Sequence, residues 1–221
     1  MPYRLTERGR ERRVAMRARI LTSAAELFAT HGYQATTLRQ VVERAGTSIG
    51  NCYFYFDNKE ALLDALVMET SAEIGAIIDE AAGQVAPGPG ALAISVYVGV
   101  THALENPAIG RLLFVEAPRA ISRRVALEFY VERARRIFAA EPGLGGTHDV
   151  DLLAHAWQGV VFQVLEAATT GGVKSPPAEV GRYLARWNLQ AIGLPRAAVQ
   201  RALQQLDRFI ESRRPVEAES A

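Results

Sequence analysis

Four consecutive aromatic residues, Tyr53 to Phe56, end a short polar segment in the stretch GTSIGNCYFYF. The side chains of this stretch suit contacts to nucleic acid. The amide of an asparagine such as Asn51 can pair with an adenine edge, and a phenyl ring can rest on a thymine methyl. A tyrosine hydroxyl can instead reach a phosphate oxygen, which positions a protein but carries no base sequence. Aromatic residues on a short helix also fit an ordinary core, so the choice depends on the helices that carry them.

Three helices are expected around this cluster. A helix over 12–31 comes first, and Thr36 or Thr37 then caps a short second helix, TLRQVVERA. Gly46 closes the second helix, and a third runs over 47–56. Two short helices joined by a glycine-containing turn form a helix-turn-helix, whose second helix enters the major groove of DNA.

The helical period predicts which side chains of the third helix face inward. With about 100° per residue, Ile49, Cys52 and Phe56 fall within roughly 60° of one another, and Tyr53 lies on their border with a buried ring. The outer face is small and polar with one exposed ring, and it carries Thr47, Ser48, Asn51 and Phe54. Asn51 and Phe54 are therefore predicted to contact bases, and Tyr53 a phosphate.

Two other classes of protein compete with a DNA-binding one. An enzyme is disfavoured, because no Ser-His-Asp order, glycine-rich phosphate loop or pair of catalytic carboxylates stands out, and no cofactor is expected. A helical adaptor could use the aromatic cluster for protein contact. Residues 1–60, however, hold ten Lys/Arg and six Asp/Glu, whereas the remainder holds fifteen and eighteen. This basic first part favours a polyanionic partner.

The run TTLRQVVERAGTSIGNCYFYFDNKEALLDAL resembles the DNA-binding domain of tetracycline-repressor-like (TetR) transcription regulators. The preceding ILTSAAELFATHGYQAT is similar to the first helix and loop of that family, so the resemblance covers about residues 12–66. It implies that Thr37, Tyr53 and Lys59 contact phosphates and that the third helix reads bases. Cys52 stands where the family often has leucine, which leaves open whether its thiol senses oxidants.

The whole chain is expected to be all-α. Further helices are predicted at roughly 59–82, 90–105, 107–115, 119–140, 149–170, 177–192 and 196–213. The resulting division is a flexible basic arm (1–11), a DNA-binding domain (12–58), a helical effector-binding and dimerisation domain (59–213, with 59–82 as connecting helix) and a disordered tail (214–221).

By the same resemblance, the larger domain binds a small effector and joins two chains into a homodimer. The protein would be a repressor that leaves a palindromic operator when the effector binds. Activation instead of repression stays open, as do the effector and the operator sequence. Polar and aromatic residues within apolar helices are the pocket candidates: Tyr97, Thr101, His102, Phe114, Phe129, Gln158 and Phe162. Such a pocket would take a largely apolar molecule.

Two apolar stripes late in the chain favour a four-helix dimer interface, in which Gly159 allows close approach. Its predicted members are Trp157, Val160, Val164, Tyr183, Leu184 and Trp187. The alternative is that both stripes fill the core of a monomer.

His148, Asp151 and His155 share one helix face and could bind a metal ion, but such residues are ordinary at a helix N-terminus, and we predict no metal. The single cysteine, Cys52, excludes an internal disulfide and suits a reducing compartment, and its predicted burial disfavours a redox role. No secretory signal or membrane-length apolar run is present, so a cytoplasmic location without membrane contact is expected.

Overall fold

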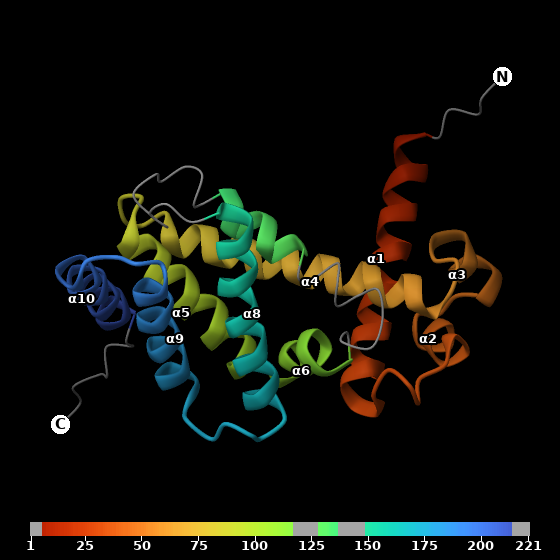
Figure 1. The fold of residues 1–221 in the computed structure, drawn as a ribbon. Coiled ribbons are helices and arrows are strands. Elements are labelled where there is room, and N and C mark those ends of the chain that lie inside the picture. The colour runs from red at the N-terminus through yellow and green to blue at the C-terminus, as the bar shows by residue number, and fades with distance from the viewer. Residues whose placement is uncertain (1–5, 117–127, 137–148, 214–221) are drawn as a thin grey trace, which may run out of the picture. The chain divides into compact units, whose positions relative to one another are not determined.

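The computed structural model describes residues 6–116, 128–136 and 149–213, and within these ranges the chain is helical and contains no strand (Figure 1). The all-α prediction is therefore confirmed for the described residues. Close backbone contacts divide the described residues into two compact units, 6–71 with 108–116 and 72–107 with 128–136 and 149–213. The sequence-based division placed 59–213 in one domain, whereas this division groups 108–116 with the N-terminal helices.

The first unit contains α1 (Glu7–His31), α2 (Leu38–Arg44), α3 (Ile49–Tyr55) and the first part of α4 (Lys59–Ala82). Helix α1 begins before the predicted residue 12, because the Thr6 hydroxyl accepts a hydrogen bond from the Gly9 amide at 3.3 Å and caps it. The helix thus includes residues 7–11, which the sequence-based division placed in the arm, and residues 1–5 lie outside the described part. The core of this unit is formed by side chains of all four helices, among them Ile20, Leu21, Phe28, Val41, Val42 and Leu63.

Helix α2 is held at its start by reciprocal capping. The Thr37 hydroxyl accepts from the Gln40 amide at 3.3 Å, and the Gln40 side-chain oxygen accepts from the Thr37 amide at 2.8 Å. Thr36 is instead buried and donates to the Gly32 carbonyl at 2.8 Å. Gly46, with φ of 61°, makes the turn that a residue with a side chain would strain, and the Ser48 hydroxyl caps α3. The predicted helix-turn-helix is therefore present.

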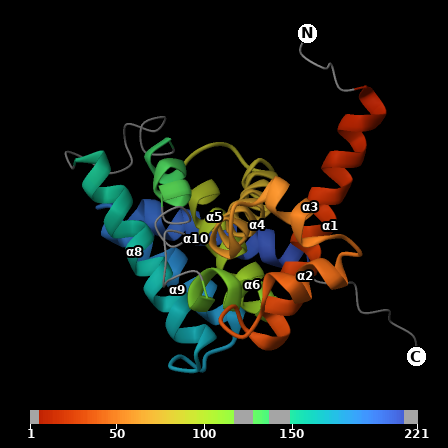
Figure 2. The same cartoon turned by 90° about the vertical axis from the view of Figure 1, so that its right-hand side faces the viewer.

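The second unit is built around α5 (Pro89–Glu105), which packs against α8 (Val150–Thr169), α9 (Pro177–Ala191) and α10 (Arg196–Ser212) (Figure 2). Most of α5 is buried, as the uncharged run over 91–104 indicated. None of the helices in the described ranges is both long and apolar enough to cross a membrane.

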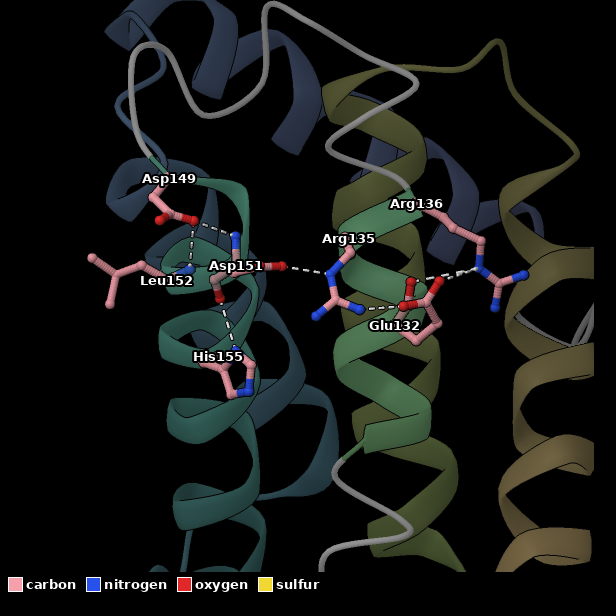
Figure 3. Close-up of polar contacts among 7 residues, drawn as sticks. All are labelled: Glu132, Arg135, Arg136, Asp149, Asp151, Leu152 and His155. Carbon is pink, nitrogen blue, oxygen red and sulfur yellow. Dashed lines mark hydrogen bonds and ion pairs between the residues drawn. The ribbon is translucent and has the colours of Figure 1, made fainter.

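A helix at residues 128–136 is tied by charge to two other helices of the second unit. Arg133 pairs with Asp79 of α4 through both carboxylate oxygens, and this hydrogen bonding lowers the pKa of Asp79. Arg135 donates to Asp151 of α8 at 2.6 Å and also pairs with Glu132 of its own helix (Figure 3). The predicted helix over 119–140 lies only partly within the described residues.

Two shorter elements follow α5, namely α6 (Pro107–Arg111) and the π-helical η1 (Leu112–Glu116), and both belong to the first unit apart from Pro107. The carboxylate of Glu116 explains this grouping. It accepts from the Tyr33 backbone amide at 3.2 Å and from Arg111 Nε at 3.1 Å. The hydrogen bond from the Tyr33 amide fixes η1 to the loop between α1 and α2.

Gly181 allows α9 to approach α5 closely. A methyl group there would lie 2.9 Å from Tyr97 Cδ2 and 3.1 Å from Thr101 Cγ2. We expect Gly181→Ala to lower the free energy of unfolding by about 1–3 kcal/mol through overpacking. Gly50→Ala is the matched control in a thermal melt without DNA, because a methyl group there meets nothing within 4 Å, and it should be neutral or slightly stabilising. Equal melts of the Gly181 variant and the parent would contradict the close packing.

Candidate nucleic-acid interface

Helix α3 presents most of its side chains to solvent. Cys52 is fully buried and Phe56, its C-cap, is 4% exposed, whereas Tyr53 and Phe54 are 51% and 59% exposed. Cys52 and Phe56 thus lie inward as predicted. Ile49 does not, because it is the first residue of the helix and lies next to the turn rather than over the core, and it is 43% exposed. The Tyr53 ring, predicted to be buried, is also half exposed.

Hydrogen bonds orient the polar residues on the outer face of α3. Asn51 Nδ2 donates to the Thr47 hydroxyl at 2.7 Å, and the Asn51 amide donates to the Ser48 hydroxyl at 3.1 Å. Thr47, Ser48 and Asn51 therefore form one connected group at the N-terminal end of the helix. An amide held in this way can meet a base edge with little further loss of side-chain entropy.

The aromatic row separates into core and surface parts, and arginines of α1 lie against both. The guanidinium carbon of Arg13 lies 4.9 Å from the centroid of the exposed Phe54 ring, and that of Arg17 lies 5.5 Å from the Phe56 ring. Phe54 also meets Tyr55 edge to face, with centroids 5.0 Å apart. Cation–π contacts of this kind stabilise an exposed ring and attach α1 to α3.

Lys59 has a different position from the one that the sequence suggested. Its ammonium donates to the carbonyl oxygens of Tyr33 at 2.8 Å and Thr36 at 2.9 Å, with Gln34 at 3.5 Å, and lies 4.2 Å from the Tyr33 ring centroid. Burial lowers the pKa of this ammonium. The three donors are thus directed at the loop before α2, and the phosphate contact stays a prediction.

The effector candidates are divided between the two units. Phe114 is buried in the first unit. In the second unit, Thr101 donates to the Tyr97 carbonyl at 2.8 Å, and both side chains face Gly181. His102 is half-buried on the same helix, one residue beyond Thr101.

The other candidates of the second unit come from α8 and the helix at 128–136. Gln158 and Phe162 are buried, and the Phe162 ring meets Tyr130 edge to face at 5.7 Å. Phe129 lies close to Gly75 of α4. Sequence reasoning missed Asn188 on α9, which is 1% exposed and whose side-chain amide has no hydrogen-bond partner among the described residues. In the sequence, Asn188 lies among the apolar residues of an amphipathic helix, and this pattern could have identified it as a pocket candidate.

The predicted interface residues differ in their burial within the single chain. Trp157 is 5% exposed and Leu184 is fully buried, so both side chains are covered by their own chain. Tyr183 is 64% exposed, and Val160, Val164 and Trp187 are partly exposed. These four residues, together with the exposed Gly159, remain the candidate dimer face.

The remaining sequence candidates concern metal and thiol chemistry. His148 lies outside the described residues, Asp151 pairs with Arg135, and His155 Nδ1 lies 2.8 Å from the Asp151 carbonyl oxygen. The described ranges hold no group of three His, Cys, Asp or Glu side chains suited to a metal ion. Burial raises the pKa of the Cys52 thiol, which opposes formation of the reactive thiolate.

A helix-turn-helix with an exposed polar and aromatic second helix is the arrangement that many DNA-binding domains use. Residues 20–66 match the model of the bacterial regulatory proteins of the tetR family. The expected resemblance to this family is therefore found over residues 20–66.

Two curated relatives are similar to part of the chain. The uncharacterised HTH-type transcriptional regulator YvkB of Bacillus subtilis (strain 168) is 35% identical over 65 residues, which cover 29% of this chain and 34% of YvkB. The HTH-type transcriptional repressor AcnR of Corynebacterium glutamicum is 38% identical over 64 residues, again 29% of this chain and 34% of the relative. The chain thus spans about a third of the length of the curated relatives it matches, and these are transcriptional regulators rather than enzymes.

The fold extends further than the sequence similarity. The structure of RolR in complex with resorcinol has a TM-score of 0.69 and covers 87% of this chain and 95% of its own, at 24% sequence identity. At this identity the likeness shows the fold alone.

Proposed function

We propose that this chain is a homodimeric, ligand-responsive transcription regulator that binds operator DNA through α3. The observation that carries this proposal is the outer face of α3, where an oriented asparagine and two exposed aromatic rings stand on a family-matched helix-turn-helix. The protein acts in the cytoplasm, where operator DNA is found. Repression is the proposed outcome, since related regulators such as AcnR are named repressors.

The DNA contacts are assigned by side-chain chemistry. Asn51 and Phe54 read base edges and thymine methyls, with Thr47 and Ser48 beside them at the N-terminal end of α3. Thr37, at the exposed start of α2, and the Tyr53 hydroxyl contact phosphates. A palindromic operator follows from two-fold pairing of two such heads.

The proposed effector is a small, largely apolar molecule bound in the second unit near Tyr97, Thr101, His102 and Gln158. Two observations support this site: α5 is almost entirely apolar with a few polar groups embedded in it, and Gln158 is buried on α8, which packs against α5. Effector binding changes the separation of the two DNA-reading heads through α4. A ligand screen by thermal shift, repeated with His102→Ala and Gln158→Ala, tests this part. Unchanged ligand responses in both variants would remove these residues from the pocket.

The base and phosphate assignments predict different effects of mutation. We expect Tyr53→Phe to lower affinity by about 0.5–1.5 kcal/mol, the net value of one hydrogen bond, on every DNA sequence alike. Asn51→Ala and Phe54→Ala should instead change the preferred base at one position of each half-site, by roughly 1–3 kcal/mol. A binding-site selection at fixed salt measures both. A changed base preference for Tyr53→Phe, with none for the other two, would refute the assigned helical phase.

A further inference from the structure

Helix α1 extends well beyond the core that supports it. Every residue from Thr6 to Ala15 is exposed, apart from the partly exposed Gly9, and the first buried side chain of the helix is Ile20. With a rise of 1.5 Å per residue, the segment Glu7–Ala15 is about 13 Å long. We call this segment the α1 overhang. A polar helical segment without a buried face gains little from packing within the chain.

The charges of the overhang are segregated around its axis. With about 100° per residue, Glu7, Glu11 and Val14 lie within roughly 60° of one another. Arg12 and Arg13 lie on the opposite side of the helix, and Arg8 lies about 40° around the axis from Arg12. The overhang therefore has an acidic and apolar face and an arginine face.

Contacts further along α1 show which way the arginine face is turned. Arg19, about two turns beyond Arg12 and three turns beyond Arg8 on the same side, donates to the Ala45 carbonyl at the end of α2. Arg13 lies over the exposed Phe54 ring of α3 at 4.9 Å. The arginine face is thus turned toward the side of α1 on which α2 and α3 lie, and Arg13 attaches the overhang to the DNA-reading helix.

We infer that the α1 overhang is an additional DNA-binding element, in which Arg8 and Arg12 contact phosphates beyond the bases that α3 reads. The inference rests on the proposed function. Charge complementarity supports it, since one strand of B-DNA presents about four phosphates along 13 Å of its axis. Phosphate contacts carry no sequence code, so the overhang adds affinity and fixes orientation without changing base preference.

Arg10 supplies a matched control on the same overhang. It is exposed like Arg12 but lies on the flank of the acidic face, about 160° around the axis from Arg12. Arg12→Gln and Arg10→Gln each remove one charge from an exposed helical position. Neither should alter the fold, which circular dichroism and a thermal melt can confirm before DNA is added.

The test is the salt dependence of binding to the selected operator. We expect Arg12→Gln to reduce the slope of log K against log salt by about 0.9 per head, and Arg8→Gln with Arg12→Gln by about 1.8, while Arg10→Gln leaves the slope unchanged. Base preference should be the same in all variants. Phosphate-ethylation interference should show contacts outside the bases read by α3, and these should be absent in the double variant.

Two results would overturn the inference. Equal slope changes for Arg12→Gln and Arg10→Gln would mean that the overhang contributes only general charge. A parent-like slope and ethylation pattern for the double variant would mean that it does not touch DNA. In both cases the parent protein still selects an operator, whereas failure of the proposed function would appear as the absence of any sequence preference in the parent.

Discussion

Gly159→Glu combined with Tyr183→Glu is expected to give a soluble monomer that binds operator DNA about 10²–10⁴-fold more weakly than the parent. Two linked heads gain this factor because the second binds at a high effective concentration once the first is bound. Tyr183 is 64% exposed, and a side chain added at Gly159 meets nothing within 4 Å in the same chain. The monomer should therefore accept both changes, while a helix packed against them from a second chain should not.

The molar mass in solution and the operator affinity measure this result. Ala178→Glu is the control, since it adds the same charge at an exposed position of α9 on another side of the helix. A dimeric double variant with parent-like affinity would place the interface elsewhere. Substituting Trp157 would be a poorer test, because a charge at that buried position would unfold the chain itself.

The sequence predicted the parts of the fold that depend on local interactions. The second helix, the Gly46 turn and the third helix could be located because capping threonine and serine residues and a glycine with positive φ act over a few residues. The start of α1 was missed, although Thr6 is also a capping residue, because the overhang has no apolar period to mark it as helix.

Burial depends on neighbours that the helical period does not identify. Trp157 and Leu184 lie on apolar stripes, but a stripe shows only that one side of a helix is covered. It does not say whether another part of the same chain or a second copy covers it. The structure shows that these two residues are covered from within, whereas Tyr183 on α9 is left exposed. The interface itself therefore stays a prediction, which now rests on the exposed residues of α8 and α9.

Lys59 illustrates the same limit for a polar side chain. Its place at the start of α4 suggested a phosphate contact, because helix N-termini attract anions. The sequence gives no sign that carbonyl groups of the loop between α1 and α2 converge on its ammonium. The structure shows this convergence, and the Tyr33 amide of the same loop donates to Glu116. The loop before α2 is therefore fixed by two charged side chains, Lys59 and Glu116.

Lys59→Met is expected to lower the free energy of unfolding by about 2 kcal/mol, because methionine keeps the aliphatic chain but loses hydrogen bonds from a charged donor to two well-placed carbonyls. Operator affinity should fall as well, since this loop leads directly into the capped start of α2 and thus sets the position of Thr37. Chemical denaturation measures the first effect and equilibrium DNA binding the second.

The salt dependence of the same variant separates a structural role from a phosphate contact. If Lys59 braces the loop, as its carbonyl contacts indicate, the slope of log K against log salt should change by less than about half a unit per head. A loss of about 0.9 per head with parent-like stability would instead establish the phosphate contact and contradict the brace.

Arg39→Met is a suitable control, since Arg39 pairs only with the neighbouring Glu43 on the exposed side of α2 among the contacts of the described residues. Its loss should leave the free energy of unfolding within about 0.5 kcal/mol of the parent value, as expected for an exposed pair on one helix. A large loss of stability in the Lys59 variant beside a small one in the Arg39 variant would assign the effect to the carbonyl contacts and not to the removal of a charge.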